Sequence, residues 1–249
     1  MSYRNNILDR LQQFRGQSVN TNTADPMTSA APDQTRSIQV KTEQFAEAMT
    51  AAHGEVIKTT SAGWQRHLFQ HLQDNAITNL MVAARGHYSD LLEVSKKEPN
   101  GPGTGLYEQK TGPSDLETER VDLETEPFDL EIVPYDQKIE ALKETLFHHT
   151  QAGLSGAFAG IAETGTLLVA TGPEEPRALS LVPPVNYVVL EAKTLFWDQR
   201  EAFTAIEKKL PLPTNLLLIS GPSKTADIQQ TLAYGAHGPK RLVVLLIED

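Results

Sequence analysis

Two segments of the chain combine residue types that could hold and process a small anion. In the first, residues 152–184, Glu163, Thr164 and Gly165 follow a run of glycines and alanines and directly precede an apolar strand. Small residues allow a backbone to approach a ligand closely. A carboxylate with small and apolar neighbours is expected to be poorly solvated, which suits a catalytic base or nucleophile. The alternative is that Glu163 only caps backbone N–H groups of the turn.

The second segment, residues 216–239, predicts an apolar strand, a short polar turn and then a helix at 226–234. Free N–H groups at the start of such a helix, the helix dipole and a lysine in the turn would together bind an anion. The pattern GxxxxGK[ST] is absent, so this is not a Walker loop. The alternative is that the hydroxyl residues cap the helix and that Lys224 points to water. The predicted ligand contacts are Thr164, Gly165, Ser220, Gly221, Ser223, Lys224, Thr225 and Asp227.

The predicted catalytic residues are Glu163 and His237. His237 follows the second segment in the sequence GAHGP, and a histidine can exchange a proton near neutral pH; it could equally interact only with the carbonyls that end the helix. His67 and His71 are spaced for a metal pair, but no third ligand is evident, so we predict no metal site. The sequence contains no recognisable Ser-His-Asp or Cys-His nucleophile motif and no GxGxxG after a strand.

An alternation of strands and helices must position these segments. The sequence predicts strands at Glu55–Thr59, 79–84, 130–133, 166–170, 185–190, Asn215–Ile219 and 242–247, and helices at 42–52, 62–73, 139–148, 199–208 and 226–234. This alternation is typical of an α/β fold with a mostly parallel open sheet and helices on both faces. Ligands of such folds bind beyond the carboxyl ends of the strands. We therefore expect the two segments to open into one pocket.

The chain divides into three predicted parts. Residues 1–15 form an amphipathic helix, residues 16–40 a flexible linker, and residues 41–249 an α/β domain with a loop insertion at about 96–127. The helix docks on a partner or on the domain, or is a loosely attached tail. The insertion is rich in proline, glycine and acidic residues, and is expected to be a solvated excursion; the alternative is a lid over the site.

Composition excludes several classes of function. The 249 residues carry a net charge of -10 with scattered basic residues, which disfavours nucleic-acid binding. The chain has no cysteine, so it forms no disulfide and cannot ligate an iron–sulfur cluster through cysteine. No apolar run approaches the roughly 20 residues of a membrane helix, and the N-terminus lacks the apolar core of a signal peptide. A cytoplasmic location is therefore expected.

Four stretches resemble the LUD-domain family of lactate-utilisation proteins. They are AETGT at 162–166, LSLVPP at 179–184, SGPSKTADI at 220–228 and GAHGP at 235–239, in that order. The chain is most similar to the C-type subunits, since the larger LUD-containing subunit adds cysteine-rich ferredoxin motifs. The resemblance implies a fold like that of the sugar-phosphate isomerases, CoA transferases and formyltetrahydrofolate cyclo-ligases (NagB/RpiA/CoA-transferase-like). In CoA transferases of that fold a glutamate in Ser-Glu-Asn-Gly is the nucleophile, and Glu163 in Ala-Glu-Thr-Gly looks similar, although its flanking residues differ.

The resemblance also implies a function. C-type members accompany A- and B-type iron–sulfur subunits in a system that oxidises L-lactate to pyruvate, with the clusters on those partners. Glu163 or His237 would then be the base for the hydroxyl proton. The electron acceptor would lie elsewhere, because this sequence shows no flavin or nicotinamide signature. Two alternatives are a stand-alone transferase, isomerase or ligase acting on a phosphorylated or CoA-linked small molecule, and a non-catalytic assembly subunit.

Overall fold

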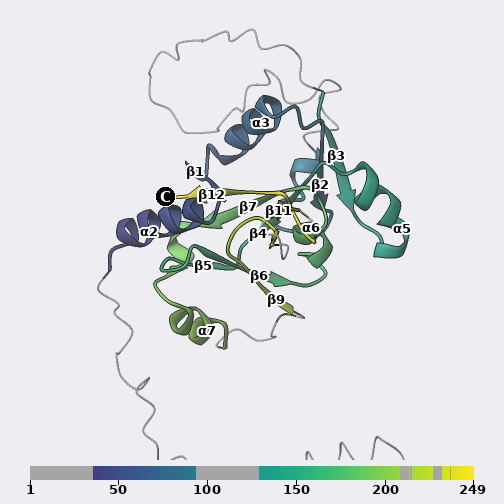
Figure 1. Ribbon diagram of the computed structural model, residues 1–249. Coiled ribbons are helices and arrows are strands. Elements are labelled where there is room, and N and C mark those ends of the chain that lie inside the picture. The colour runs from purple at the N-terminus through teal and green to yellow at the C-terminus, as the bar shows by residue number, and fades with distance from the viewer. Residues whose placement is uncertain (1–35, 94–128, 208–212, 214, 227–231, 236) are drawn as a thin grey trace, which may run out of the picture. The chain divides into compact units, whose positions relative to one another are not determined.

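A parallel six-stranded sheet forms the centre of the fold (Figure 1). Its strands lie in the order β1-β12-β7-β4-β2-β3, and all five neighbouring pairs run parallel. The strands are β1 (Glu55–Thr59), β2 (Asn79–Ala83), β3 (Glu131–Tyr135), β4 (Ala152–Gly156), β7 (Val185–Glu191) and β12 (Arg241–Ile247). The predicted mostly parallel open sheet is confirmed.

The computed structural model describes residues 36–93, 129–207, 213, 215–226, 232–235 and 237–249. The predicted helix at 1–15, most of the predicted linker and the predicted insertion lie outside these residues. Helix α2 begins at Ile38, inside the range assigned to the linker, and the Ser37 hydroxyl accepts a hydrogen bond from Val40 N at its start. The division into three parts stays a prediction. Among the described helices, none has both the length and the apolar character needed to cross a bilayer.

Helices cover both faces of the parallel sheet because its strands alternate side chains between the faces. On one face α3 (Trp64–Asp74) packs Leu68 and Leu72 against a cluster that includes Val82, Tyr187 and Leu245. On the other face lies α2 (Ile38–Ala51), whose buried residues Phe45 and Met49 meet Val188, Leu190, Val244 and Leu246.

Short helices complete the second face beside β2. There α6 (Arg177–Leu181) contributes Leu179 to a cluster with Met81 and Ala83. Helix α5 (Ile139–Glu144) continues into a π-helical turn (Thr145–His149), which adds Leu146 to the same cluster. The helices predicted at 42–52, 62–73, 139–148 and 199–208 are all present within a few residues of their expected bounds.

A second sheet of four strands packs on the face that α2 covers. Its order is β8-β5-β6-β9, formed by β8 (Leu195–Phe196), β5 (Ala159–Ile161), β6 (Thr166–Thr171) and β9 (Asn215–Ile219). Ala162, Leu167 and Leu195 from this sheet and its turns join Phe45 and Met49 in one core cluster. Helix α7 (Gln199–Glu207) covers the other side of the second sheet with Ala202 and Ile206.

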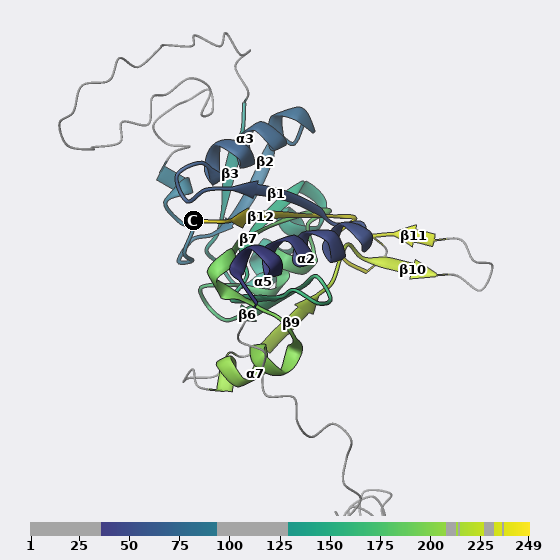
Figure 2. The same ribbon diagram turned by 90° about the vertical axis from the view of Figure 1, so that its left-hand side faces the viewer.

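The structure corrects two predictions made for the C-terminal part. Residues 166–170 and Asn215–Ile219 are strands as predicted, but they pair antiparallel in the second sheet and not in the parallel one. The predicted helix at 226–234 is wrong: β10 (Lys224–Ala226) and β11 (Leu232–Tyr234) form an antiparallel hairpin, which extends away from the sheets in Figure 2. Cross-strand pairing satisfies backbone groups that a helix would pair internally. The crossover helix expected between Asn215–Ile219 and 242–247 is therefore absent from the described part.

Gly165 provides a test of how tightly the second sheet is placed against α2. Its φ is +59°, and a Cβ there would overlap the backbone N of Met49 and lie 2.8 Å from the carbonyl carbon of Ala48. Gly165→Ala is expected to lower the free energy of unfolding by at least about 1 kcal/mol, measured by urea denaturation.

Gly172→Ala is the matched control, because nothing lies within 4 Å of a Cβ at that position. Its change in unfolding free energy should stay within about 0.5 kcal/mol. Equal losses in the two variants would contradict the close contact inferred between Gly165 and α2.

Candidate functional site

The order of the parallel strands places a topological switch point between β2 and β4. From β2 the chain continues to β3 on one side, and from β4 it continues by way of the second sheet to β7 on the other side. The loops after β2 and β4 therefore diverge, and in open α/β sheets this is where ligands bind, beyond the carboxyl ends of the strands. At this switch point residues 84–88 follow β2, and Gly156 ends β4.

A buried carboxyl group lies at this edge. The loop between β6 and α6 folds over the end of β4, closed by backbone hydrogen bonds that Gly172 N and Glu175 N donate to each other's carbonyl oxygens, at 3.0 and 3.3 Å. Glu175 Oε2 accepts a hydrogen bond from Gly156 N at 3.0 Å. Glu175 Oε1 is shielded from solvent and has no hydrogen-bond partner among the described residues. Burial raises the pKa of Glu175 to about 7, opposed by the hydrogen bond from Gly156.

Two glycines allow this loop to lie directly on the sheet edge. A Cβ at Gly86 would lie 2.6 Å from the carbonyl oxygen of Glu174. A Cβ at Gly156 would lie 3.2 Å from the hydroxyl of Tyr88 and 3.4 Å from Glu175 Oε2. Tyr88 and Glu175 therefore meet above Gly156, and any larger residue there would push them apart.

Tyr88 is held in a neutral form at this edge. Burial raises the pKa of the Tyr88 phenol above its ordinary range, and the carboxylates of Glu175 and Glu191 raise it further. Its ring packs edge-on against Trp64 at a centroid distance of 5.3 Å, and the His87 ring lies edge-on at 5.1 Å. The phenol therefore brings a hydrogen-bonding group, and no charge, to the neighbourhood of Glu175.

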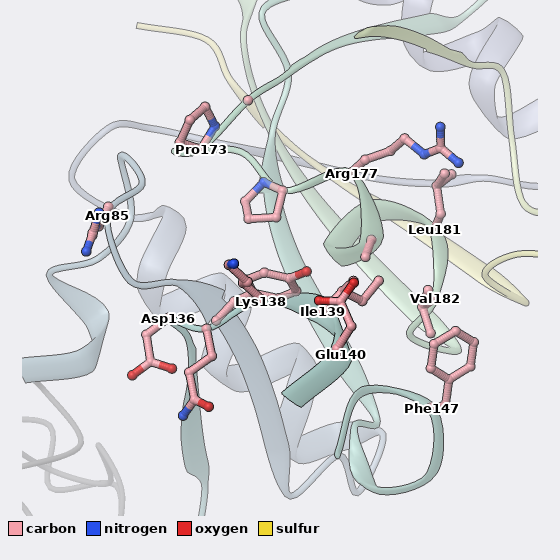
Figure 3. Close-up of a pocket in the computed structure, with 15 residues that line it drawn as sticks. Arg85, Asp136, Lys138, Ile139, Glu140, Phe147, Pro173, Arg177, Leu181 and Val182 are labelled. Atoms are coloured by element: carbon pink, nitrogen blue, oxygen red, sulfur yellow. The ribbon is translucent and has the colours of Figure 1, made fainter. Parts of the chain in front are cut away.

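A cavity of about 1030 Å³ lies on the other side of the same loop (Figure 3). Gly172, Pro173 and Pro176 face this cavity, whereas Glu175 turns toward Gly156. The rest of the lining comes from the ends of β2 and β3, from α5 and its π-turn, and from α6: Arg85, Tyr135, Asp136, Lys138, Ile139, Glu140, Phe147, Arg177, Leu181 and Val182 among them.

The cavity is largely apolar, and its charged lining residues are of both signs. Ile139 and Phe147 are 41 % and 52 % exposed there, which is unusual for large apolar side chains. Arg85 lies with Pro173 at one end of the cavity, and the Arg177 side chain extends away from Arg85 (Figure 3). The basic side chains are thus spread around the rim and do not converge on one anion.

The structure brings together the two turns that the sequence singled out. Thr164 Oγ1 and Thr166 Oγ1 are 2.7 Å apart, and Thr166 Oγ1 is 2.7 Å from Ser220 Oγ. The pairing of Leu167 with Ile219 in the second sheet fixes this arrangement. However, the cavity of Figure 3 is not lined by these turns. Because Lys224–Ala226 and Leu232–Tyr234 are paired strands, the described residues of this segment contain no helix whose dipole would attract an anion.

The remaining predicted site residues are largely exposed. Glu163 N donates to Trp197 O at 3.0 Å, but the Glu163 side chain faces solvent, so the expectation of a poorly solvated carboxylate is wrong. Glu163 lies in the turn between β5 and β6, and this turn places its side chain at the surface. Lys224 and His237 are exposed as well. The side chain of Thr225 and the whole of Asp227 lie outside the described residues, and the catalytic roles of Glu163 and His237 stay predictions.

Gly221 and Ser223 have backbone roles beside the second sheet. Gly221 has φ +136°, and a Cβ there would lie 2.8 Å from the carbonyl oxygen of Ala52, at the end of α2. Ser223 N donates to Pro239 O at 2.8 Å, and Ser223 O accepts from Gly235 N at 2.9 Å. Both residues thus hold the turn and the base of the hairpin in place.

The histidine pair on α3 has protein partners. His67 Nδ1 is 2.7 Å from the Thr59 hydroxyl, and His71 Nδ1 is 2.8 Å from the Tyr187 hydroxyl. Across the described residues, no group of three or more metal-ligating side chains is placed to hold a metal ion. The pair therefore links α3 to the parallel sheet.

Comparison with known proteins identifies a matching family, similar sequences and a solved structure with a similar fold. The LUD domain model matches residues 42–247. An uncharacterized protein of Neisseria meningitidis serogroup B is 34% identical, over 82% of this chain and 76% of its own length. Lactate utilization protein C of Bacillus pumilus is also 34% identical, but the match covers 40% of this chain and 44% of that protein. The structure of a DUF162 family protein from Deinococcus radiodurans has a TM-score of 0.51 at 17% identity, covering 85% of this chain and 99% of that one, and so supports the fold.

The raised pKa of Glu175 predicts a pH-dependent contribution to stability. Between its ordinary value of 4.5 and about 7, the folded chain holds this proton more tightly than the unfolded chain. The stabilisation is therefore complete below pH 4.5 and is lost as the pH rises through 7. Relative to Glu175→Gln, the wild type should lose on the order of 3 kcal/mol between pH 4.5 and pH 8, measured by urea unfolding at each pH.

Glu174→Gln is the control for this measurement, because the neighbouring Glu174 side chain is exposed. That variant should follow the wild-type pH profile. A constant difference between wild type and Glu175→Gln across the same range would show that Glu175 does not titrate with a raised pKa.

Proposed function

This chain belongs to the LUD domain family, and from that membership we propose that it is the cluster-free subunit of a cytoplasmic system that oxidises L-lactate to pyruvate. The observation that carries the proposal is the family match over residues 42–247, joined to similarity with proteins named lactate utilization protein C. The chain contains no cysteine, so cysteine-ligated clusters would be on A- and B-type iron–sulfur partners.

The ligand of this subunit is proposed to be a small anion bound at a sheet edge. Two places in the molecule support such a site. One is the cavity at the carboxyl edge of the parallel sheet, where the basic residue Arg85 follows β2 (Figure 3). The other is the hydroxyl-rich pair of turns with Thr164 and Ser220, near the exposed Glu163.

Recovery of partners from lactate-grown cells tests the assignment to a multi-subunit system. A tagged full-length chain should bring down cysteine-rich iron–sulfur proteins, identified by mass spectrometry and by iron content. Cells expressing the tag alone are the control. If no cysteine-rich protein is enriched, and cells lacking the chain grow on L-lactate at the wild-type rate, the proposed function is wrong.

Glu163→Gln tests whether the predicted base acts in the chemistry. If Glu163 takes the hydroxyl proton of lactate, this variant abolishes growth on L-lactate while partner recovery is unchanged, because an amide cannot accept the proton. A purely structural subunit would tolerate the change. Growth at the wild-type rate, with the variant present at wild-type levels, removes Glu163 from catalysis.

A stand-alone enzyme acting on a phosphorylated or CoA-linked molecule is the alternative from the sequence. It differs from the proposal in one measurable way, since such an enzyme turns over its substrate without partners. Turnover by the purified chain alone, without enrichment of iron–sulfur proteins from cells, would favour it.

A further inference from the structure

Strand β9 leaves one side of the second sheet open. It is the outer strand in the order β8-β5-β6-β9, and within the described part of the chain only β6 pairs with it (Figure 1). Its sequence, NLLLI, contains no charged residue, no proline and no glycine. The Leu218 side chain is 45 % exposed. An outer strand of this kind offers a row of N–H and C=O groups to a further strand.

The backbone of Leu218 faces this open side. Leu218 lies opposite Leu168 of β6, and the carbonyl oxygen of Leu168 accepts a hydrogen bond from Phe158 N at 2.8 Å, on the side of β5. Opposed residues of antiparallel strands alternate between hydrogen-bonded and non-hydrogen-bonded pairs, so Leu168 and Leu218 form a non-hydrogen-bonded pair. Leu216, two residues earlier, follows the same alternation. The N–H and C=O groups of Leu216 and Leu218 therefore point away from β6.

The other outer strands have features that oppose pairing with another chain. Strand β1 contains Glu55 and Lys58, and β3 contains Glu131 and Pro134. Strand β8 has only two residues. Charged residues, proline and short length are the features by which proteins generally protect their sheet edges. Strand β9 has five residues and none of these features, so it is the outer strand best suited to association.

We propose that β9 pairs antiparallel with β9 of a second copy of this chain, which joins the two second sheets into one continuous sheet. A two-fold axis would pass beside Leu217. Leu216 of each copy would then lie opposite Leu218 of the other, and their outward N–H and C=O groups would bond to one another. The exposed Leu218 side chain would be covered by Leu216 of the other copy, as in other apolar cross-strand pairs.

The chemistry of β9 suits a second copy because the strand is compatible with itself. Antiparallel pairing about a two-fold axis brings the same residues to both sides, so any charge on the strand would be brought near its own copy. The chain has a net charge of -10, which already opposes self-association, and β9 adds no charge to this repulsion. The alternative occupant is a strand of another protein, and the experiments below distinguish the two.

Cross-linking tests the register directly, because the chain has no cysteine of its own. In the proposed pairing Leu217 faces its own copy in a non-hydrogen-bonded pair, where Cα atoms are about 4.5 Å apart, a separation that a disulfide spans. Purified full-length Leu217→Cys should therefore form a disulfide-linked pair of chains under mild oxidation, measured on a non-reducing gel.

Two single-cysteine variants are the controls for this cross-link. Leu218→Cys should cross-link less than Leu217→Cys, because residue 218 would face residue 216 of the other copy. Val40→Cys should give only background cross-linking, because Val40 is 46 % exposed on α2, away from β9.

Sedimentation measures the association without any cysteine. The average mass of the wild-type chain should rise from that of one chain toward that of two between about 1 µM and about 200 µM, as expected for a small interface. Leu218→Lys should raise the dissociation constant at least about tenfold, because it places a charge in the apolar junction. Val40→Lys, the matched exposed position, should keep the wild-type profile.

Several results would overturn the proposal. They are a constant mass of one chain across this range, equal cross-linking of Leu217→Cys and Val40→Cys, and association that continues beyond two chains. If the wild type stays a single chain and Leu218→Lys loses a protein that co-purifies with the wild type, β9 binds another protein and pairing with a second copy is wrong. None of these results depends on whether the chain serves lactate oxidation.

Discussion

Close contact over the small residues of β4 is the constraint on which the site depends. A Cβ at Gly153 would lie 2.6 Å from the carbonyl oxygen of Leu179, and one at Gly156 would meet Tyr88 and Glu175. Because Gly153 and Gly156 carry no side chain, α6 and the loop before it can pack directly against the backbone of β4. This contact buries the Glu175 carboxyl and turns its second oxygen away from solvent. Bulkier side chains along β4 would lift both α6 and the loop, and the carboxyl would return to water and to its ordinary pKa.

The second sheet has a different role, because it holds turns in place without enclosing a described cavity. Its antiparallel pairing of β6 with β9 puts Thr166 beside Ser220, and glycines at 165 and 221 let both turns lie against the end of α2. The hydroxyl groups of Thr164, Thr166 and Ser220 contact one another in sequence. These contacts account for the hydroxyl residues at this place without a bound ligand. A motif of small and hydroxyl residues can therefore mark close packing as readily as it marks chemistry.

The sequence predicts the parallel core well because buried strands such as 185–190 and 242–247 are largely apolar runs of the right length. Strand β4 was not predicted, since its AGLSG sequence has low strand propensity and forms only between neighbouring strands. The helix predicted at 226–234 failed because cross-strand pairing outweighed local propensity. Glu175 could not be found from local sequence, because its burial depends on Gly156 and Tyr88, which lie far away along the chain. Glu163 was favoured by its neighbours in sequence, and the turn geometry exposes it.

The absence of cysteine bears on how the proposed system would divide the chemistry of lactate oxidation between its subunits. Oxidising an alcohol releases protons and electrons, and these need different chemical groups to receive them. Cysteine-ligated clusters take electrons one at a time, and this chain has no cysteine with which to hold one. Burial raises the pKa of the Glu175 carboxyl to about 7, and the hydrogen bond from Gly156 N fixes its orientation. Within the proposed system, the iron–sulfur partners would therefore take the electrons. The exposed Ile139 and Phe147 around the neighbouring cavity add apolar surface on the other side of the loop that carries Glu175.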